Sequence, residues 1–267
     1  MKNKQHFLSV IVPVYQQAKT IRQDIYSIYD TLEQIRYDYE IIVVVDGTTS
    51  DYSFQEAKKL KLKKLKVTGY PNNRGKGFAV RYGMSQTKGD YVAFIDAGME
   101  IDPNGLSMVL EHLEWYQADI IIASKRHPAS QVNYPFYRKV ISYLAWIFSR
   151  IFLGLNVHDT QAGLKIFKKT VLNKVLPRLL VKNFAFDLEI LAVAKHLGFK
   201  KIYEAPVKLT YDFNSLHLQG SFVKILIKTL QDALAIFYRL RILHYYDDNQ
   251  KRHRYYDPEL GMNINLG

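Results

Sequence analysis

The chain has 267 residues, of which 48% are hydrophobic and 23% charged, so it buries a sizeable core and is neither disordered nor a small disulfide-dependent scaffold. Because it contains no cysteine, thiolate metal sites and cysteine nucleophiles are excluded, and the remaining oxygen and imidazole ligands favour Mg²⁺ or Mn²⁺. Lys and Arg number 37 against 25 Asp and Glu, and the net charge of +12 predicts an anionic partner: nucleic acid, an anionic membrane face or a phosphorylated substrate.

Strand-like and helix-like segments alternate over the first half of the chain. Apolar, β-branched runs predict strands over residues 8–15, 40–45, 65–69, 91–95 and 119–123, and helical periodicity lies between them, near residues 18–36, 51–62, 76–87 and 103–117. This alternation is typical of βαβ units around a mostly parallel sheet with helices on both faces. Ligands of such sheets bind beyond the carboxyl ends of the strands, so we expect the chemistry in the turns after Tyr15, Val45 and Ile95.

The second half has longer amphipathic segments. We expect a helix over residues 135–155, a strand over 164–167, a helix over 184–197, a strand over 201–209 and a helix over 221–243. One side of the last helix carries Phe222, Leu226, Leu230, Ala233, Phe237 and Leu240. From Tyr245 onward no period is visible, and we predict irregular structure. The chain is therefore divided into a catalytic domain at 1–220 and a C-terminal amphipathic helix with an irregular tail at 221–267.

No segment is predicted to cross a membrane. The first residues, MKNKQHF, lack the apolar run of a signal peptide. The most apolar stretch, residues 140–157, is interrupted by Arg150 and falls short of the roughly 18 uncharged apolar residues that a spanning helix needs. We expect a cytoplasmic protein that is still able to lie on a membrane surface.

Two predicted buried strands end in candidate functional residues. The first ends in Pro13-Val14-Tyr15, which taken alone is also compatible with an ordinary strand end. The second delivers Asp46, followed by Gly47 and hydroxyl residues. A carboxylate at this place accepts hydrogen bonds from a nucleotide base or ribose, or it caps the helix that follows.

Three carboxylates follow the predicted strand over residues 91–95, namely Asp96, Glu100 and Asp102. Carboxylates gathered at one strand end repel one another unless a cation or a hydrogen-bond donor balances them. A divalent metal that bridges diphosphate oxygens would do so. The alternative is a helix that starts at Asp102-Pro103 beside solvated acids, which explains Asp102 but not Asp96.

Four motifs occur in one order: VPVYQQ (12–17), VVDGTTSD (44–51), NRGKGFAVRYG (73–83) and FIDAGMEIDP (94–103). They resemble, in register, the V-P-x-Y-N-E, V-D-D-G-S-x-D, N-x-G-K-G and D-x-D blocks of glycosyltransferase family 2, the nucleotide-sugar-dependent inverting enzymes. The resemblance implies an α/β, GT-A-like (Rossmann-like) fold, with a mostly parallel mixed sheet flanked by helices and C-terminal amphipathic helices. It also implies a set of donor-binding residues: Pro13, Tyr15, Asp46, Lys76, Asp96 and Ala97.

Two later motifs narrow the resemblance. DTQAGLKIF (159–167) and FAFDLEIL (184–191) are similar to the D-T-Q-x-G-x-K and W-x-F-D-x-E blocks of polyprenyl-phosphate glycosyltransferases. Within that group the chain resembles dolichyl-phosphate β-glucosyltransferases most and mannosyltransferases less. This implies a dolichyl or undecaprenyl phosphate acceptor and a UDP-glucose or other UDP-hexose donor. Asp159 and Gln161 would orient the donor sugar or the acceptor phosphate.

The chain departs from the family pattern at three positions. Val45 replaces the first aspartate of D-D, Gly98 replaces the second aspartate of D-x-D, and Gln17 replaces the glutamate of the opening motif. Since the second aspartate is a metal ligand in the resembling enzymes, we assign the Mg²⁺ or Mn²⁺ ion to Asp96 and Glu100.

A phosphate acceptor needs positive charge more than it needs a base, because its second pKa near 6 leaves it largely anionic at neutral pH. By resemblance, Lys125, Arg126, Arg138 and Ser142 bind this phosphate, and Arg126 and Arg138 also take part in catalysis. Solvated surface charge is the alternative for Arg126. For Arg138 the alternative is a cationic helix flank, which membrane association would also use. The apolar residues of this helix would then face lipid or the prenyl chain, and a plain core helix is the alternative for them: Tyr143, Leu144, Trp146, Ile147, Phe148 and Phe152.

The sequence therefore predicts a metal-dependent, inverting sugar transferase on the cytoplasmic membrane face, without a nucleic-acid partner and with no indication of oligomeric state. One alternative is a family 2 enzyme with a hydroxyl acceptor, for which Asp159 or Asp187 would have to act as the base. A second is a non-catalytic binding module, suggested by Val45 and Gly98. A third is a basic nucleic-acid binder, which would show a steep dependence on salt.

Overall fold

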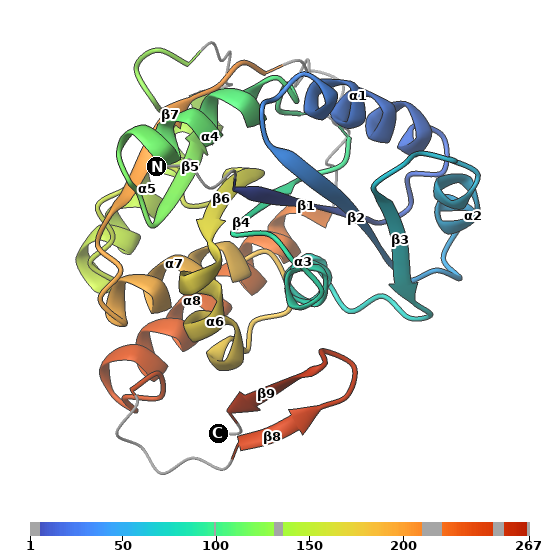
Figure 1. Ribbon diagram of the computed structural model, residues 1–267. Coiled ribbons are helices and arrows are strands. Elements are labelled where there is room, and N and C mark those ends of the chain that lie inside the picture. Colours follow the sequence, from blue (N-terminus) through green and yellow to red (C-terminus); the bar gives the residue numbers. More distant parts are fainter. Residues whose placement is uncertain (1–5, 99, 131–135, 210–220, 248–253, 266–267) are drawn as a thin grey trace.

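The structure is a computed structural model that describes residues 6–98, 100–130, 136–209, 221–247 and 254–265, with only the backbone described for 136–141 and 221–223. Within these residues, a seven-stranded sheet lies between two layers of helices, and a two-stranded hairpin stands apart from it (Figure 1). The sheet strands are β1 (Phe7–Val14), β2 (Asp38–Asp46), β3 (Leu65–Tyr70), β4 (Tyr91–Ile95), β5 (Ile120–Ser124), β6 (Leu164–Lys168) and β7 (Ile202–Pro206).

Helices join the strands much as the periodicity predicts. They are α1 (Ile21–Glu33), α2 (Ser53–Lys58), α3 (Lys76–Ser85), α4 (Gly105–Trp115), α5 (Phe136–Phe152), α6 (Lys169–Val175), the 3₁₀ helix η1 (Leu176–Arg178), α7 (Phe186–His196) and α8 (Ser221–Arg241). α2 is shorter than the predicted 51–62, and α6 with η1 occupies a stretch for which the sequence predicts no element. Among the described helices, none is long and apolar enough to cross a membrane.

The order of the strands is β3-β2-β1-β4-β6-β5-β7, and only β6 runs against its two neighbours. The remaining pairs are parallel, which confirms the mostly parallel mixed sheet. The carboxyl ends of parallel strands meet at one edge, and an antiparallel strand begins at that same edge. The segments after β1, β2, β4 and β5 and the segment before β6 therefore converge there.

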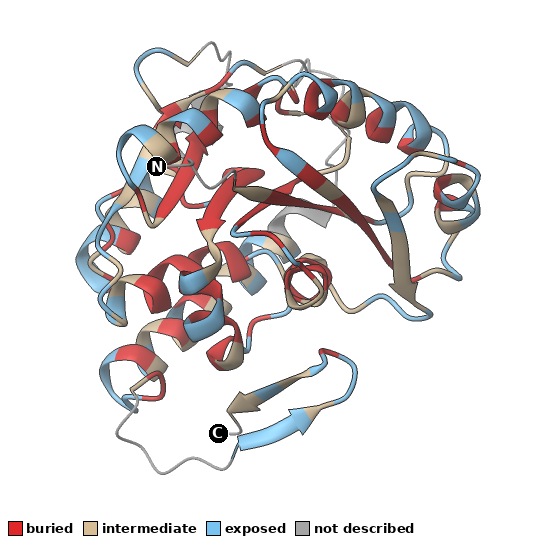
Figure 2. Cartoon of the chain, viewed as in Figure 1, coloured by how far each residue is buried: buried red, intermediate tan, exposed pale blue. Residues whose placement is uncertain are grey.

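Alternation along the central strands divides the core between the two faces of the sheet. In β1, Val10 and Val12 pack in the same cluster as α1, α2 and α4, whereas Ile11 packs with α3, α6, α7 and α8. Both sets are fully buried, which explains why the strands read as continuous apolar runs instead of alternating ones. Figure 2 shows these central strands as buried and the outer surface of α1 as partly exposed.

The tail is not irregular throughout, which corrects the expectation from the sequence. Residues 254–265 include the antiparallel pair β8 (Arg254–Asp257) and β9 (Met262–Asn265). The strands are only four residues long, too short for a periodic pattern, and the turn between them uses Gly261 at φ +61°.

The apolar stripe of α8 is only partly covered by the core. Ala233 and Leu240 are buried, but Leu226 and Leu230 are 39% and 54% exposed. The side chain of Phe222 lies outside the described residues. The C-terminal half of α8 therefore packs on the domain, while the half before it presents apolar side chains to solvent.

Candidate active site

The residues that the motifs single out meet at the carboxyl edge of the sheet. Tyr15 follows β1, Asp46 ends β2, and Asp96 and Ala97 follow β4. Lys125 and Arg126 come directly after β5, and residues 159–163 enter the antiparallel strand β6 from the same edge. Pro13 lies inside β1 opposite Val44, and Tyr15 is 46% exposed. The topology thus brings together motifs that are more than 100 positions apart in the sequence.

Asp46 holds the loop that begins α3. Its carboxylate is buried and accepts hydrogen bonds from the Asn73 side-chain amide (2.9 Å) and from the backbone N–H groups of Arg74 (2.6 Å) and Gly75 (2.9 Å). A carboxylate has about four acceptor positions, so little capacity remains for a ligand. Asp46 therefore fixes residues 73–75, which lead into Lys76 at the start of α3. Residues 73–76 are called the donor loop below, after the donor-binding role that the motif resemblance implies for Lys76.

Four charges of alternating sign form a network beneath the edge. Lys76 Nζ donates to Asp96 Oδ2 at 2.8 Å and to Asp187 Oδ2 at 3.3 Å. Lys165 Nζ donates to Asp187 Oδ1 at 2.5 Å and to the carbonyl of Ala162 at 2.7 Å. Lys165 and Asp187 are almost completely buried, whereas Asp96 is 32% exposed. The network therefore runs from the core to the surface and ends at Asp96.

Burial and pairing act in opposite directions on the protonation of this network. Burial raises the pKa of Asp96, an effect that Lys76 partly offsets. Burial opposes the charged form of Lys76, but the carboxylates of Asp187 and Asp96 outweigh it and raise the pKa of Lys76. Burial lowers the pKa of Lys165 despite its contact with Asp187. Lys76 is thus a firmly charged ammonium group at the site.

The loop that contains the D-T-Q motif packs directly against Asp96. The Asp96 backbone N–H donates to the carbonyl of Gly163 at 2.9 Å. A Cβ atom on Gly163 would lie 2.6 Å from Asp96 Oδ2, so a larger residue would displace the carboxylate. Asp159 is buried within this loop, whereas Gln161 is exposed. The close packing explains the glycine that follows Gln161-Ala162.

Gly98, where the family pattern has an aspartate, adopts a backbone conformation suited to glycine. Its φ is +92°, and a Cβ atom would lie 3.0 Å from Gln17 Nε2. Its N–H donates to Asp24 Oδ2 at 3.2 Å. Glu100, two residues further on, accepts from Lys125 Nζ at 3.1 Å. The segment after β4 thus turns sharply and returns Glu100 toward the end of β5.

Restoring the aspartate at this position is expected to cost stability. Gly98→Asp should lower the free energy of unfolding by about 1–2 kcal/mol, because a side chain at positive φ is strained. Gly198→Ala is the matched control, since Gly198 has φ +93° and nothing within 4 Å of a Cβ atom. Urea unfolding of both variants separates the backbone strain from the added contact with Gln17. A Gly98→Asp protein as stable as the wild type would contradict this explanation.

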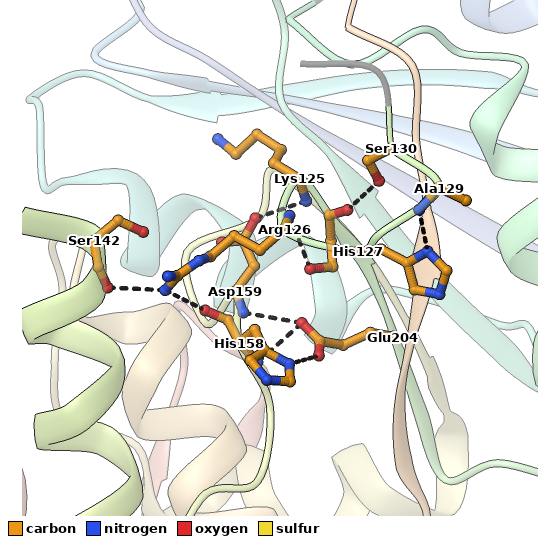
Figure 3. Close-up of polar contacts among 10 residues, drawn as sticks. Lys125, Arg126, His127, Ala129, Ser130, Ser142, His158, Asp159 and Glu204 are labelled. Atoms are coloured by element: carbon orange, nitrogen blue, oxygen red, sulfur yellow. Dashed lines mark hydrogen bonds and ion pairs between the residues drawn. The ribbon is translucent and has the colours of Figure 1, made fainter. Parts of the chain in front are cut away.

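A second cluster, of mainly basic residues, lies after β5 (Figure 3). The Lys125 N–H donates to Asp159 Oδ2 at 2.9 Å, and the Arg126 guanidinium donates to the carbonyls of Ser142 (3.0 Å) and His158 (3.3 Å). Ser142 therefore meets Arg126 through its main chain and not through its hydroxyl group. The structure brings four of the predicted residues together here, while the side chain of Arg138, near the start of α5, lies outside the described residues.

Glu204 supports this cluster from β7. It accepts from the backbone N–H groups of His158 (3.0 Å) and Asp159 (2.9 Å), and its other oxygen lies 2.8 Å from His158 Nδ1. The imidazole of His158 stacks on the Trp146 ring with a centroid separation of 5.6 Å. Although burial acts the other way, hydrogen bonds from Ser124, His158 and Asp159 lower the pKa of Glu204. The charged carboxylate thus holds the start of the D-T-Q loop.

Glu204→Gln is expected to destabilise the protein most at neutral pH, by about 1–3 kcal/mol, because charged hydrogen bonds are lost. The folded protein holds Glu204 with a pKa below its ordinary value of 4.5, so the charged form stabilises the fold above that pH. This contribution disappears as the pH falls through the lowered pKa. In urea unfolding, the difference in stability from wild type should therefore be largest at pH 7 and should shrink as the pH is lowered toward 3.

Lys165, His158 and Glu204 are absent from the sequence-based assignment, and Asp187 enters it only as an alternative base. Lys165 and Asp187 lie inside the D-T-Q-x-G-x-K and F-D-x-E motifs, and this position in a motif was the available signal. His158 and Glu204 lie in no recognised motif, so only the pairing of β5 with β7 and the loop before β6 bring them together.

The sequence profile of the family described as "Glycosyl transferase family 2" matches residues 9–176, more than half of the chain. This chain belongs to glycosyl transferase family 2. Among curated relatives, the human dolichyl-phosphate β-glucosyltransferase is 30% identical over 88% of this chain and 76% of its own length. The Drosophila melanogaster enzyme of the same name is 32% identical over 71% of this chain. A dolichol-phosphate mannosyltransferase of Pyrococcus furiosus is 29% identical over 87% of this chain.

These relatives are longer than the region they share with this chain. The match covers 63% of the Drosophila enzyme and 63% of the Dictyostelium discoideum enzyme of the same name. The family match over residues 9–176 contains the four N-terminal motifs and the D-T-Q motif, so it confirms the family that they indicate.

Solved structures of two sugar-phosphoglycerate synthases share the fold. Mannosyl-3-phosphoglycerate synthase from Rubrobacter xylanophilus superposes with a TM-score of 0.68 at 18% identity, covering 98% of this chain and 87% of its own. Glucosyl-3-phosphoglycerate synthase from Mycobacterium tuberculosis, in complex with Mn²⁺, UDP-glucose and phosphoglyceric acid, superposes with a TM-score of 0.62 at 18% identity. The superposition covers 86% of this chain and 80% of the synthase. These similarities confirm the GT-A-like α/β architecture predicted from the motifs.

Proposed function

We propose that this protein transfers a hexose, in the first instance glucose from UDP-glucose, to a polyprenyl phosphate of the dolichyl or undecaprenyl type, by a metal-dependent, inverting single displacement. The observation that carries the proposal is the contact between Glu100 and Lys125 at 3.1 Å. It places the acidic segment after β4 against the basic segment after β5. One site therefore offers carboxylates suited to a metal-bound diphosphate and cations suited to a phosphate acceptor.

The carboxylates at this edge of the sheet suit a hard divalent cation only when a substrate supplies further ligands. Among the described residues, no cluster of three or more acidic or histidine side chains could hold a metal alone. Asp96 and Glu100 are 32% and 37% exposed, and each is neutralised by a lysine. Mg²⁺ and similar ions are commonly held by one or two carboxylates together with substrate phosphates. Asp96 and Glu100 would hold the ion, which would neutralise charge on the leaving diphosphate.

A phosphate acceptor suits the carboxylates of this site better than a hydroxyl acceptor does. A hydroxyl acceptor requires a base, but Asp187 is 1% exposed and is bound by two lysines. Asp159 is 8% exposed and accepts the N–H of Lys125. An acceptor phosphate oxygen is already anionic, so it forms the new bond to the sugar carbon as the bond to the diphosphate breaks, without loss of a proton.

The residues of the chain then have separable roles. The donor loop, held by Asp46, places the ammonium group of Lys76 beside Asp96 for contact with the diphosphate. Pro13, Tyr15 and Ala97 line the same edge, where the nucleotide would lie. Lys125 and Arg126 would hold the acceptor phosphate, with Ser142 and Arg138 on α5. Asp159 and Gln161 would orient the sugar or the phosphate between these two halves.

We also propose that the exposed faces of α5 and α8 rest on a membrane surface, where a polyprenyl acceptor is found. Tyr143, Leu144 and Ile151 of α5 are at least 51% exposed. The ring of Phe152 on α5 packs edge-on against the ring of Phe237 on α8, with the ring centroids 5.4 Å apart. The surface continues on α8, where the exposed Lys224 and Lys228 lie beside exposed apolar residues. These apolar residues are Leu226, Ile227, Leu230 and Leu234. An apolar face flanked by lysines suits anionic lipid. Phe148, by contrast, packs against the core and does not face lipid. Binding to the cytoplasmic face of the membrane stays a prediction from the sequence.

The decisive experiment combines donor selection with product analysis. Purified protein is incubated in detergent with polyprenyl phosphate, Mn²⁺ and either UDP-glucose or GDP-mannose. We expect a glucosylated lipid from the first donor and thermal stabilisation by UDP with Mn²⁺ above that by GDP, CDP or dTDP. Transfer to soluble hydroxyl acceptors alone would support the alternative family 2 activity. Nucleotide binding without any transfer would support a non-catalytic module.

A further inference from the structure

The hairpin formed by β8 and β9 reaches the donor loop from the far end of the chain. The Glu259 carboxylate in its turn forms an ion pair with the Arg74 guanidinium. The Asp257 carboxylate fixes this turn by accepting the N–H groups of Glu259 (2.9 Å) and Leu260 (3.1 Å). Leu260 is buried, and in Figure 1 the hairpin lies below α3. The turn is therefore an ordered contact and not a loose end.

Arg74 connects this hairpin to the centre of the site. Its guanidinium lies 3.9 Å from the centroid of the Phe78 ring, and its backbone N–H donates to Asp46 Oδ1 at 2.6 Å. The next residue but one is Lys76, which contacts Asp96. A displacement of the Arg74 side chain would thus be transmitted within two residues to the ammonium group proposed to meet the diphosphate.

The segment after α8 supports the first turn of α3, next to the donor loop, from a second direction. The hydroxyl of Tyr246 donates to Glu189 at 2.7 Å, and Glu189 accepts the N–H groups of Leu180 and Val181. The carbonyl of Lys182, next in the chain, accepts the N–H of Phe78 at 3.1 Å. The C-terminal segment thus contacts Arg74 directly through the hairpin turn, and it is linked to α3 indirectly through Glu189 and residues 180–182.

We propose that the β8–β9 hairpin is a strap that sets the position of the donor loop, and that Glu259 is a positioning residue for donor binding. The inference rests on the proposed function, because it takes the donor loop as a contact for the nucleotide-sugar diphosphate. Glu259 itself touches no substrate, so its effect belongs in donor affinity and not in the chemical step.

The test uses Glu259→Gln in the full-length protein, with Glu111→Gln as the matched control. Glu111 is an equally exposed carboxylate that pairs with Arg36 at 2.9 Å, on helix α4 in the other helical layer. Glu259→Gln should raise the dissociation constant for UDP and the KM for UDP-glucose about two- to fivefold, the range for an exposed ion pair, with kcat unchanged. In an Arg74→Met background the same substitution should add nothing, because the effect acts through Arg74.

Amide hydrogen exchange without ligand provides a second readout. Glu259→Gln should accelerate exchange at Arg74 and Gly75, whose N–H groups bind Asp46, and Glu111→Gln should not. Unchanged exchange and unchanged UDP affinity would overturn the strap. Faster exchange with unchanged affinity would overturn the role in donor binding. If the wild type binds no nucleotide, the proposed function fails, while the exchange rates still decide whether the hairpin holds the loop.

Discussion

Asp96→Asn is expected to reduce sugar transfer by at least about 100-fold, the usual cost of removing one preorganised charge from an active site. Asparagine keeps the shape of the side chain but removes the charge that pairs with Lys76 at 2.8 Å. It also removes one of the two carboxylates proposed to hold the cation. The variant should therefore lose the Mn²⁺-dependent part of UDP binding, measured by calorimetry, together with transfer, measured as labelled lipid product.

Asp102→Asn is the control for this substitution. Asp102 follows the same strand and accepts hydrogen bonds from the backbone and side chain of Asn104 at 3.0 and 2.9 Å. It therefore belongs to the start of α4, and its loss should leave UDP binding and transfer within about twofold of wild type, as for most surface substitutions. Full activity of Asp96→Asn, or equal losses in both variants, would contradict the assignment of Asp96 to the donor site.

Asp187→Asn is expected to lower the free energy of unfolding by about 3–5 kcal/mol, because removing one partner of a buried ion pair leaves the other charge uncompensated. Lys165 is 0% exposed, and Asp187 is the carboxylate that it contacts at 2.5 Å. Lys76 would retain Asp96 but lose its second partner. Urea denaturation measures the loss, and the donor KM should rise because Lys76 is held from one side only.

The double variant Lys165→Met/Asp187→Leu separates charge from packing. It removes both buried charges, so it should be less destabilised than Asp187→Asn, although it changes more atoms. Glu111→Gln, which breaks the exposed pair with Arg36, should cost no more than about 1 kcal/mol. A single variant more stable than the double variant would show that packing, and not the unpaired Lys165 charge, dominates at this position.

Much of the fold was predictable because burial on both faces leaves a simple mark on a strand. The continuous apolar run that contains Val10, Ile11 and Val12 identifies β1. The helical periods between such runs identify the helices that cover the parallel sheet. The tail shows the opposite case. The hairpin strands are four residues long and contain only exposed or half-buried residues, so neither length nor periodicity distinguishes them from a loop.

The donor side of the site was predictable for a related reason. Asp46 ends a recognisable strand, Asp96 directly follows another, and Lys76 starts a helix after a glycine, so their places follow from the element boundaries. What these groups touch did not follow. The carboxylate of Asp46, for which the motif predicts contact with a nucleotide, also binds the donor loop through three hydrogen bonds.

The sequence by itself determined the order of the seven sheet strands and most of the helices between them, the family, and which strand ends carry charge, because these depend on local pattern and motif spacing. Only the tertiary structure decided the partners. The antiparallel entry of β6 brings Gly163 against Asp96, and the pairing of β7 with β5 brings Glu204 under His158. The return of the C-terminus places Glu259 on Arg74. Contacts between residues so distant in sequence arise from sheet topology and chain closure, which a local pattern does not encode.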